Sequence, residues 1–74
     1  MPIDTWRERI VCDPHIHHGE PCIRGSRVAV AVIVASLADL SMDELLQQFP
    51  QLTREDIHAA LYYAAEAAHN TLVA

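Results

Sequence analysis

Residues 17–30, HHGEPCIRGSRVAV, bring together side chains that bind metals or anions. Histidine and cysteine are zinc ligands, and paired arginines bind phosphate or carboxylate groups. A cysteine beside histidines and arginines can also be activated as a nucleophile. Gly19, Pro21 and Gly25 interrupt the run, which is typical of a turn. Four interpretations therefore compete: a metal site, a reactive thiol, an anion site and a plain turn.

The spacing of the possible metal ligands disfavours zinc. Strong zinc sites use spaced pairs such as CxxC or HExxH, and the chain has neither pair. The adjacent side chains of His17 and His18 should diverge in a turn. We expect a solvated turn with no metal and no cofactor, and keep a metal-binding protein or enzyme as a further alternative. That alternative would use His15, His17, His18 and Cys22.

A reactive thiol at Cys22 is also disfavoured. Arg24 could lower the pKa of that thiol, but Pro21 and Ile23 flank it as in a buried strand. A domain this small has little room for a deep catalytic pocket. We therefore expect a protein without enzymatic activity, in which Cys12 and Cys22 are small buried apolar residues with reduced thiols.

The two arginines of the turn favour contact with another molecule. The segment lacks the lysine and the glycine spacing of a P-loop, and Gly25 is expected to supply a positive φ angle. We expect Arg24 and Arg27 to pair with acidic groups across an interface. The alternative is phosphate contact with operator DNA, in which Arg54 would also take part.

Length and charge favour a protein that is completed by another chain. The 74 residues form one domain, and a chain of this size buries only about 60% of its unfolded surface. Five arginines, no lysine and ten acids give a formal charge of −5. The excess of acids lies in residues 28–74, whereas nucleic-acid binders present a basic face. We expect at least a homodimer, and the acidic half disfavours binding to DNA as a monomer.

The chain shows no feature that predicts a membrane location. Its start lacks the basic residues and apolar run of a signal peptide. The longest apolar stretch, residues 28–40, is interrupted by Ser36 and Asp39 and is too short to span a bilayer. We therefore expect a cytoplasmic protein with no membrane contact.

The pattern of apolar residues predicts a mainly α fold. Residues 1–27 should form a strand-and-turn arm with short strands at 10–12 and 22–23. Residues 28–70 should form three helices, the first over about 30–39, and residues 71–74 a tail.

The predicted second and third helices are consistent with a helix-turn-helix motif. Ser41 and Glu44 form a capping box, Pro50 ends the second helix, and Thr53 is expected to cap the third. The short link between the helices fits this motif.

The third helix is expected to have an inner and an outer face. Tyr62 and Tyr63 on the outer face are candidates for partner contact, because tyrosine is enriched at interfaces. Glu55 and Asp56 near its start would be repelled by DNA phosphates. The expected inner stripe is Ile57, Ala60, Leu61, Ala64, Ala65 and Ala68, and the outer face is Ala59, Tyr62, Tyr63 and Glu66.

Two sequence pieces resemble the bacterial domain of unknown function family 433. They are IVCDPHIHHGEPCIRGSRVAV and LSMDELLQQFPQLTREDIHAALYYAAE, within residues 10–66. The family pattern usually has lysine, threonine and proline where this chain has Glu20, Ser26 and Ala29. The change at Glu20 removes a positive charge and further weakens a DNA-binding role.

This resemblance implies a homeodomain-like three-helix fold, usually seen as a dimer. It also implies a small antitoxin-like (VapB-type) protein that neutralises a PIN-domain-like ribonuclease toxin encoded by a neighbouring gene. Arg24, Gly25 and Arg27 match the family motif and are carried over as structural or partner-binding residues. The alternative is a DNA-binding transcriptional repressor, which acts on its own operon.

Overall fold

The computed structural model of the chain describes residues 3–15 and 19–73. A short 3-10 helix and two short strands come before three α-helices, which confirms the predicted mainly α fold with an N-terminal hairpin. The elements are η1 (Ile3–Arg9), β1 (Ile10–Val11), β2 (Cys22–Ile23), α1 (Val30–Ser36), α2 (Met42–Gln48) and α3 (Arg54–Val73). None of the described helices combines the length and the apolar character needed to span a membrane.

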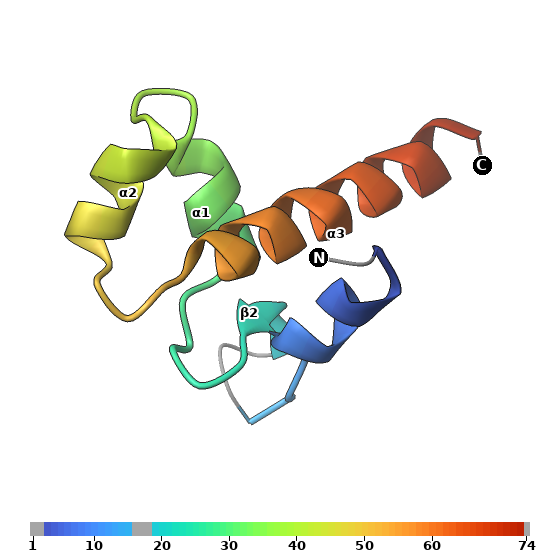
Figure 1. Ribbon diagram of the computed structural model, residues 1–74. Coiled ribbons are helices and arrows are strands. Elements are labelled where there is room, and N and C mark those ends of the chain that lie inside the picture. The colour runs from blue at the N-terminus through green and yellow to red at the C-terminus, as the bar shows by residue number, and fades with distance from the viewer. Residues whose placement is uncertain (1–2, 16–18, 74) are drawn as a thin grey trace.

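The other helices pack around α3, the longest helix (Figure 1). Its first turns lie beside α1 and α2, and η1 packs against it on another side. Its last turns extend past α1 and α2 (Figure 1). The N-terminal arm is therefore an integral part of the fold and covers a face of the longest helix.

The hairpin is short, and additional backbone bonds connect it to α1. Strands β1 and β2 are antiparallel, with Ile10 opposite Ile23. The N–H of Ile23 donates to the carbonyl of Val28 at 2.9 Å, and the N–H of Val30 donates to the carbonyl of Pro21 at 3.0 Å. Two-residue strands are not stable alone. Here the returning chain supplies the missing partners and fixes where α1 begins.

Four of the elements each contribute one fully buried large side chain to a single core. These residues are Ile23, Ile33, Leu45 and Ile57, from β2, α1, α2 and α3 respectively. Burial of each such side chain contributes about 1.5–3 kcal/mol to folding. The hairpin and all three α-helices therefore share one core.

Reciprocal side-chain bonds close the first turns of α2 and α3. The capping box predicted at Ser41 is confirmed: its N–H donates to Glu44 Oε1 (2.9 Å), and the Glu44 N–H donates to Ser41 Oγ (3.1 Å). The bond from the Ser41 N–H to the carboxylate, with a smaller contribution from the Ser41 side chain, lowers the pKa of Glu44 below its ordinary value. At α3, Thr53 is the cap as predicted, and it exchanges bonds with Asp56 at 3.0 and 3.2 Å.

The structure corrects several predicted element boundaries. The sequence did not predict η1, because its residues show no apolar period. The first helix ends at Ser36 and is followed by a turn, earlier than the predicted end near residue 39. The third helix continues to Val73, past the predicted end at His69 or Asn70. Neither glycine nor proline follows Arg54, so no residue there breaks the helix.

The predicted faces of α3 were partly wrong. Ala59, assigned to the outer face, is fully buried, whereas Leu61 is 39% exposed. Ala65 and Ala68, which were placed in the inner stripe, are also exposed. The reason is η1, which buries a second side of α3 and changes which residues face the interior.

Replacing Asp56 by alanine should destabilise the fold markedly. This buried carboxylate accepts bonds from Arg9 Nη1 (2.9 Å) and from the N–H of Thr53, so its loss removes two charge-assisted bonds at once. We expect the free energy of unfolding in urea to fall by about 2 kcal/mol. Asp43→Ala is the matched control, because that carboxylate is 73% exposed and its loss should cost less than about 0.5 kcal/mol. Equal losses in the two variants would contradict the role given to Asp56.

Glu44→Gln should remove part of the pH dependence of stability. A carboxyl whose pKa is lowered in the folded state stabilises the fold above its unfolded pKa, about 4.3, and loses this effect as the pH falls through its folded pKa. The variant should therefore be less stable than the natural protein at pH 7, and the difference should shrink by pH 3. Urea unfolding followed by circular dichroism at both pH values measures the difference. A difference that stays constant with pH would be inconsistent with this cause.

Candidate interaction surfaces

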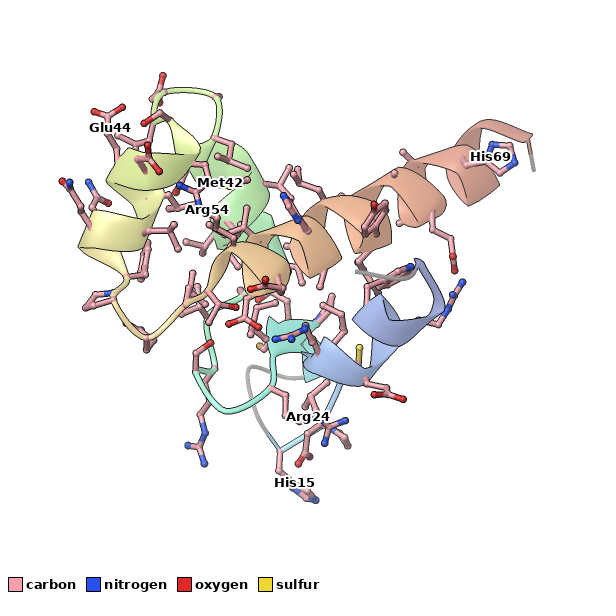
Figure 2. All side chains as sticks on the ribbon, viewed as in Figure 1. His15, Arg24, Met42, Glu44, Arg54 and His69 are labelled. Atoms are coloured by element: carbon pink, nitrogen blue, oxygen red, sulfur yellow. The ribbon has the colours of Figure 1, made fainter. Side chains whose placement is uncertain are left out.

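The predicted arginine turn is an exposed loop that follows β2. The N–H of Arg24 donates to the carbonyl of Arg9, and its side-chain Nε donates to the carbonyl of Glu8, both at 2.7 Å. The N–H of Arg27 donates to the carbonyl of Ile23 at 3.0 Å. The side chain of Arg24 points to the lower edge of the molecule in Figure 2, away from α2. Hydrogen bonds thus connect the start of the turn to η1 and the end of the turn to β2.

Two residues of this turn have left-handed backbone conformations. Gly25 has φ +87°, which confirms the expected role of this glycine. A Cβ atom there would meet no other atom within 4 Å, so the requirement for glycine is conformational and not one of space. Arg27 has φ +60°, a conformation that costs a non-glycine residue about 1 kcal/mol or more.

A cavity of about 290 Å³ opens beside the turn. Its apolar lining comes from β1 and β2, and the two arginines of the turn also line it. The lining residues are Val11, Cys22, Ile23, Arg24, Gly25 and Arg27. Such a combination suits an anionic group attached to an apolar one.

The other arginines already have acidic partners within the chain. Arg54, predicted as a partner or DNA contact, pairs with Asp43 and donates to Met42 Sδ at 3.2 Å (Figure 2). Arg7 pairs with Glu66. With Arg9 bound to Asp56, the only arginines in residues 3–15 and 19–73 without an acidic partner are the two of the turn.

Among the residues that the structure describes, no three potential metal ligands come together as a metal site would require. His15 is exposed, and its N–H donates to Asp13 Oδ1; His17 and His18 lie outside the described residues. The Cys22 thiol is buried and donates to the carbonyl of Glu20 at 3.2 Å. Burial, with smaller effects of Glu20 and Cys12, raises the pKa of this thiol. Cys22 is therefore a poor nucleophile, whereas Cys12, expected to be buried, is exposed.

The predicted tyrosines belong to an aromatic cluster with Trp6. The Trp6 ring stacks on Tyr62 with centroids 6.2 Å apart, and Tyr63 meets it edge-on at 6.4 Å. Arg7 lies over the same ring at 4.5 Å. Tyr62 is exposed, whereas Tyr63 is half-buried, and burial raises the pKa of its phenol. Sequence reasoning missed Trp6, although its status as the single tryptophan in the chain was an available signal.

A second cavity is an apolar groove between α1 and α3, with a volume of about 510 Å³. Small and branched apolar side chains form most of its walls, and Tyr63 connects it to the aromatic cluster. Glu20 is the single charged residue of the lining. The lining residues are Glu20, Pro21, Val30, Ala31, Val34, Ala35, Tyr63, Ala64 and Ala67. A groove of this composition fits an apolar segment of another chain.

Residues 10–64 match the family described as "Protein of unknown function (DUF433)". The chain belongs to this family. The match begins at β1 and ends within α3, so the DUF433 region contains the arginine turn and both tyrosines. It excludes η1 and therefore also Trp6, which covers α3 in this chain.

One relative of this DUF433 protein is "Uncharacterized protein y4eO" from Sinorhizobium fredii (strain NBRC 101917 / NGR234). The two are 39% identical over 59 residues, which is 78% of this chain. The matched region spans 27% of the relative's length, so most of that protein has no counterpart in this chain. No solved structure matches the chain.

Gly25→Ala should destabilise the DUF433 fold for a conformational reason. An L-alanine at φ +87° costs about 1–2 kcal/mol, although the added methyl group has free space. Chemical synthesis of the 74-residue chain allows D-alanine as the matched control, because D-residues prefer positive φ. We expect urea unfolding to show a loss with L-alanine and none with D-alanine. Equal losses would mean that Gly25 is required for another reason.

Proposed function

We propose that this protein is a non-enzymatic, cytoplasmic binding protein whose α1–α3 groove receives an apolar helix of a second protein. The groove carries this proposal, because about 510 Å³ of mostly apolar space remains open on the surface of a very small domain. By its resemblance to antitoxin-like proteins, the proposed partner is a PIN-domain-like ribonuclease toxin encoded by a neighbouring gene.

Exposed apolar side chains support completion by another chain. Val32, Leu61 and Tyr62 are large apolar or aromatic side chains that remain more than one-third exposed. A toxin subunit or a second copy of this chain would cover such surface, and we expect a homodimer when no toxin is bound.

The charge of the helices suits inhibition of a nuclease. Nucleases bind a polyanion through cationic side chains or metal ions, and acidic residues can occupy the same sites. Glu44 lies exposed at the start of α2, and the neighbouring Asp43 is also exposed but is paired with Arg54, so a cationic group of the toxin would have to replace that arginine. Helix α2 is therefore a candidate for contact with the cationic site of the toxin.

The DNA-repressor alternative has less support. Arg54, the cation nearest the start of α3, is paired with Asp43 and is not available for phosphate. Glu55 and Asp56 follow it directly, and both are acidic residues in the first turn of that helix. A recognition helix normally places polar and basic side chains at this position.

Co-expression with the product of the adjacent gene tests the proposal. The natural protein should co-purify with that product and relieve its toxicity. Ala31→Glu places a charge in the groove at an exposed helical position and should weaken the complex about tenfold or more. Ala65→Glu is the matched control, because Ala65 is exposed and helical but does not line the groove.

The outcomes of this experiment are distinct. Absence of a complex and of relief would contradict the antitoxin role, and equal effects of the two variants would contradict the groove as the docking site. A shift of the protein's own promoter DNA that is lost in Arg54→Ala would favour the repressor instead, with a steep dependence on salt.

A further inference from the structure

We propose that the cavity beside the Arg24–Arg27 turn binds a carboxylate group of the partner protein. This inference rests on the proposed function, since it names the chemistry by which a second surface would recognise the same partner. The cavity of about 290 Å³ lies at the hairpin, and none of its lining residues lines the α1–α3 groove. A partner that contacts both surfaces would be held by apolar contact at one and by charge at the other.

The distribution of charge on the chain favours an anion at this turn. The chain carries a formal charge of −5, and its other three arginines are in ion pairs with Glu66, Asp56 and Asp43. Arg24 and Arg27 are both exposed and have no acidic partner within the described ranges. The turn is thus a local cationic site on an acidic protein, and two arginines that line one cavity suit a carboxylate.

Two hydrogen bonds restrict the position of Arg24. Its Nε is bound to the carbonyl of Glu8, and its backbone N–H is bound to the carbonyl of Arg9. These bonds hold the side-chain stem, while the two terminal nitrogens make no hydrogen bond to the described residues. Less conformational freedom is then lost when a ligand binds, which is the advantage of a preorganised site.

The backbone conformation of Arg27 also favours a ligand site. This arginine has φ +60°, a conformation that glycine or asparagine adopts more readily. Strained residues of this kind cluster at ligand sites, where the gain in binding offsets the cost in stability. No ion pair within the described residues accounts for an arginine at this position, so a ligand from outside the chain is the better explanation.

The apolar lining of the cavity favours a peptide carboxylate over a phosphate. Val11 and Ile23 are apolar, and a thiol such as that of Cys22 never carries a positive charge, so these side chains add no cation to the two arginines. A carboxylate next to an apolar side chain matches both parts of the cavity. A phosphodiester would bring a polyanion toward a protein with twice as many acids as arginines.

Nuclear magnetic resonance titration of the ¹⁵N-labelled protein tests this site. The probes are N-acetyl-leucine for a chain-terminal carboxylate, N-acetyl-glutamate α-amide for a side-chain carboxylate, N-acetyl-leucinamide for the uncharged control, and inorganic phosphate. At constant ionic strength, a carboxylate probe should shift the amide signals of Gly25, Ser26 and Arg27 and the Nε signal of Arg24. The leucinamide should not shift them, and the stronger of the two carboxylates identifies the source.

Two variants of the site and one matched control localise the effect. Arg27→Asn keeps a residue that tolerates positive φ, so it should fold with unchanged or higher stability and yet bind at least tenfold more weakly. Arg24→Gln should weaken binding to a similar extent. Arg54→Gln removes the same charge outside the cavity and should leave binding unchanged within about twofold.

Three results would overturn the proposal. They are no carboxylate-dependent shift at the turn, equal weakening by Arg54→Gln, and a stronger response to phosphate than to either carboxylate. The groove and the turn can fail separately, because Ala31→Glu changes only the groove and Arg27→Asn changes only the turn.

Discussion

The structure depends on one small core in which four elements meet. Ile23, Ile33, Leu45 and Ile57 are each almost completely buried, and each comes from a different element. A core with so few large side chains provides little stability to spare. Polar bonds between the elements therefore help to fix their relative positions. The bond from Arg9 to Asp56 joins η1 to the first turn of α3, and the bond from Arg24 to Glu8 joins the turn to η1.

Local signals predicted most of the elements correctly. Capping at Ser41 and Thr53 and the stop at Pro50 depend on neighbouring residues, so the sequence shows them directly. The 3-10 helix was missed because it is stabilised by tertiary contact with α3 and has no apolar period of its own. The same contact explains the error at Ala59, since amphipathic patterns assume that a helix has one buried side.

The candidate surfaces were predictable in part. The positive φ of Gly25 followed from residue type, whereas the positive φ of Arg27 did not, because arginine rarely adopts it. Which arginines are paired could not be read from the chain: Arg54 and Asp43 are eleven residues apart and meet only when α2 folds beside α3. The groove between α1 and α3 could not be predicted from the sequence either, because it depends on how these two helices are placed in the fold.

The long α3 has a dynamic consequence. Its twenty residues rise about 30 Å, and exposed residues predominate from Ala65 to His69, while Ile57 and Ala60 near its start are fully buried. Amide hydrogens near Ile57 should exchange with solvent only through global opening, and those near His69 through local fraying. Protection of the amide hydrogens from exchange therefore decreases along this one helix. A ligand that covers the C-terminal half of α3 would extend the protected part toward the end of the chain.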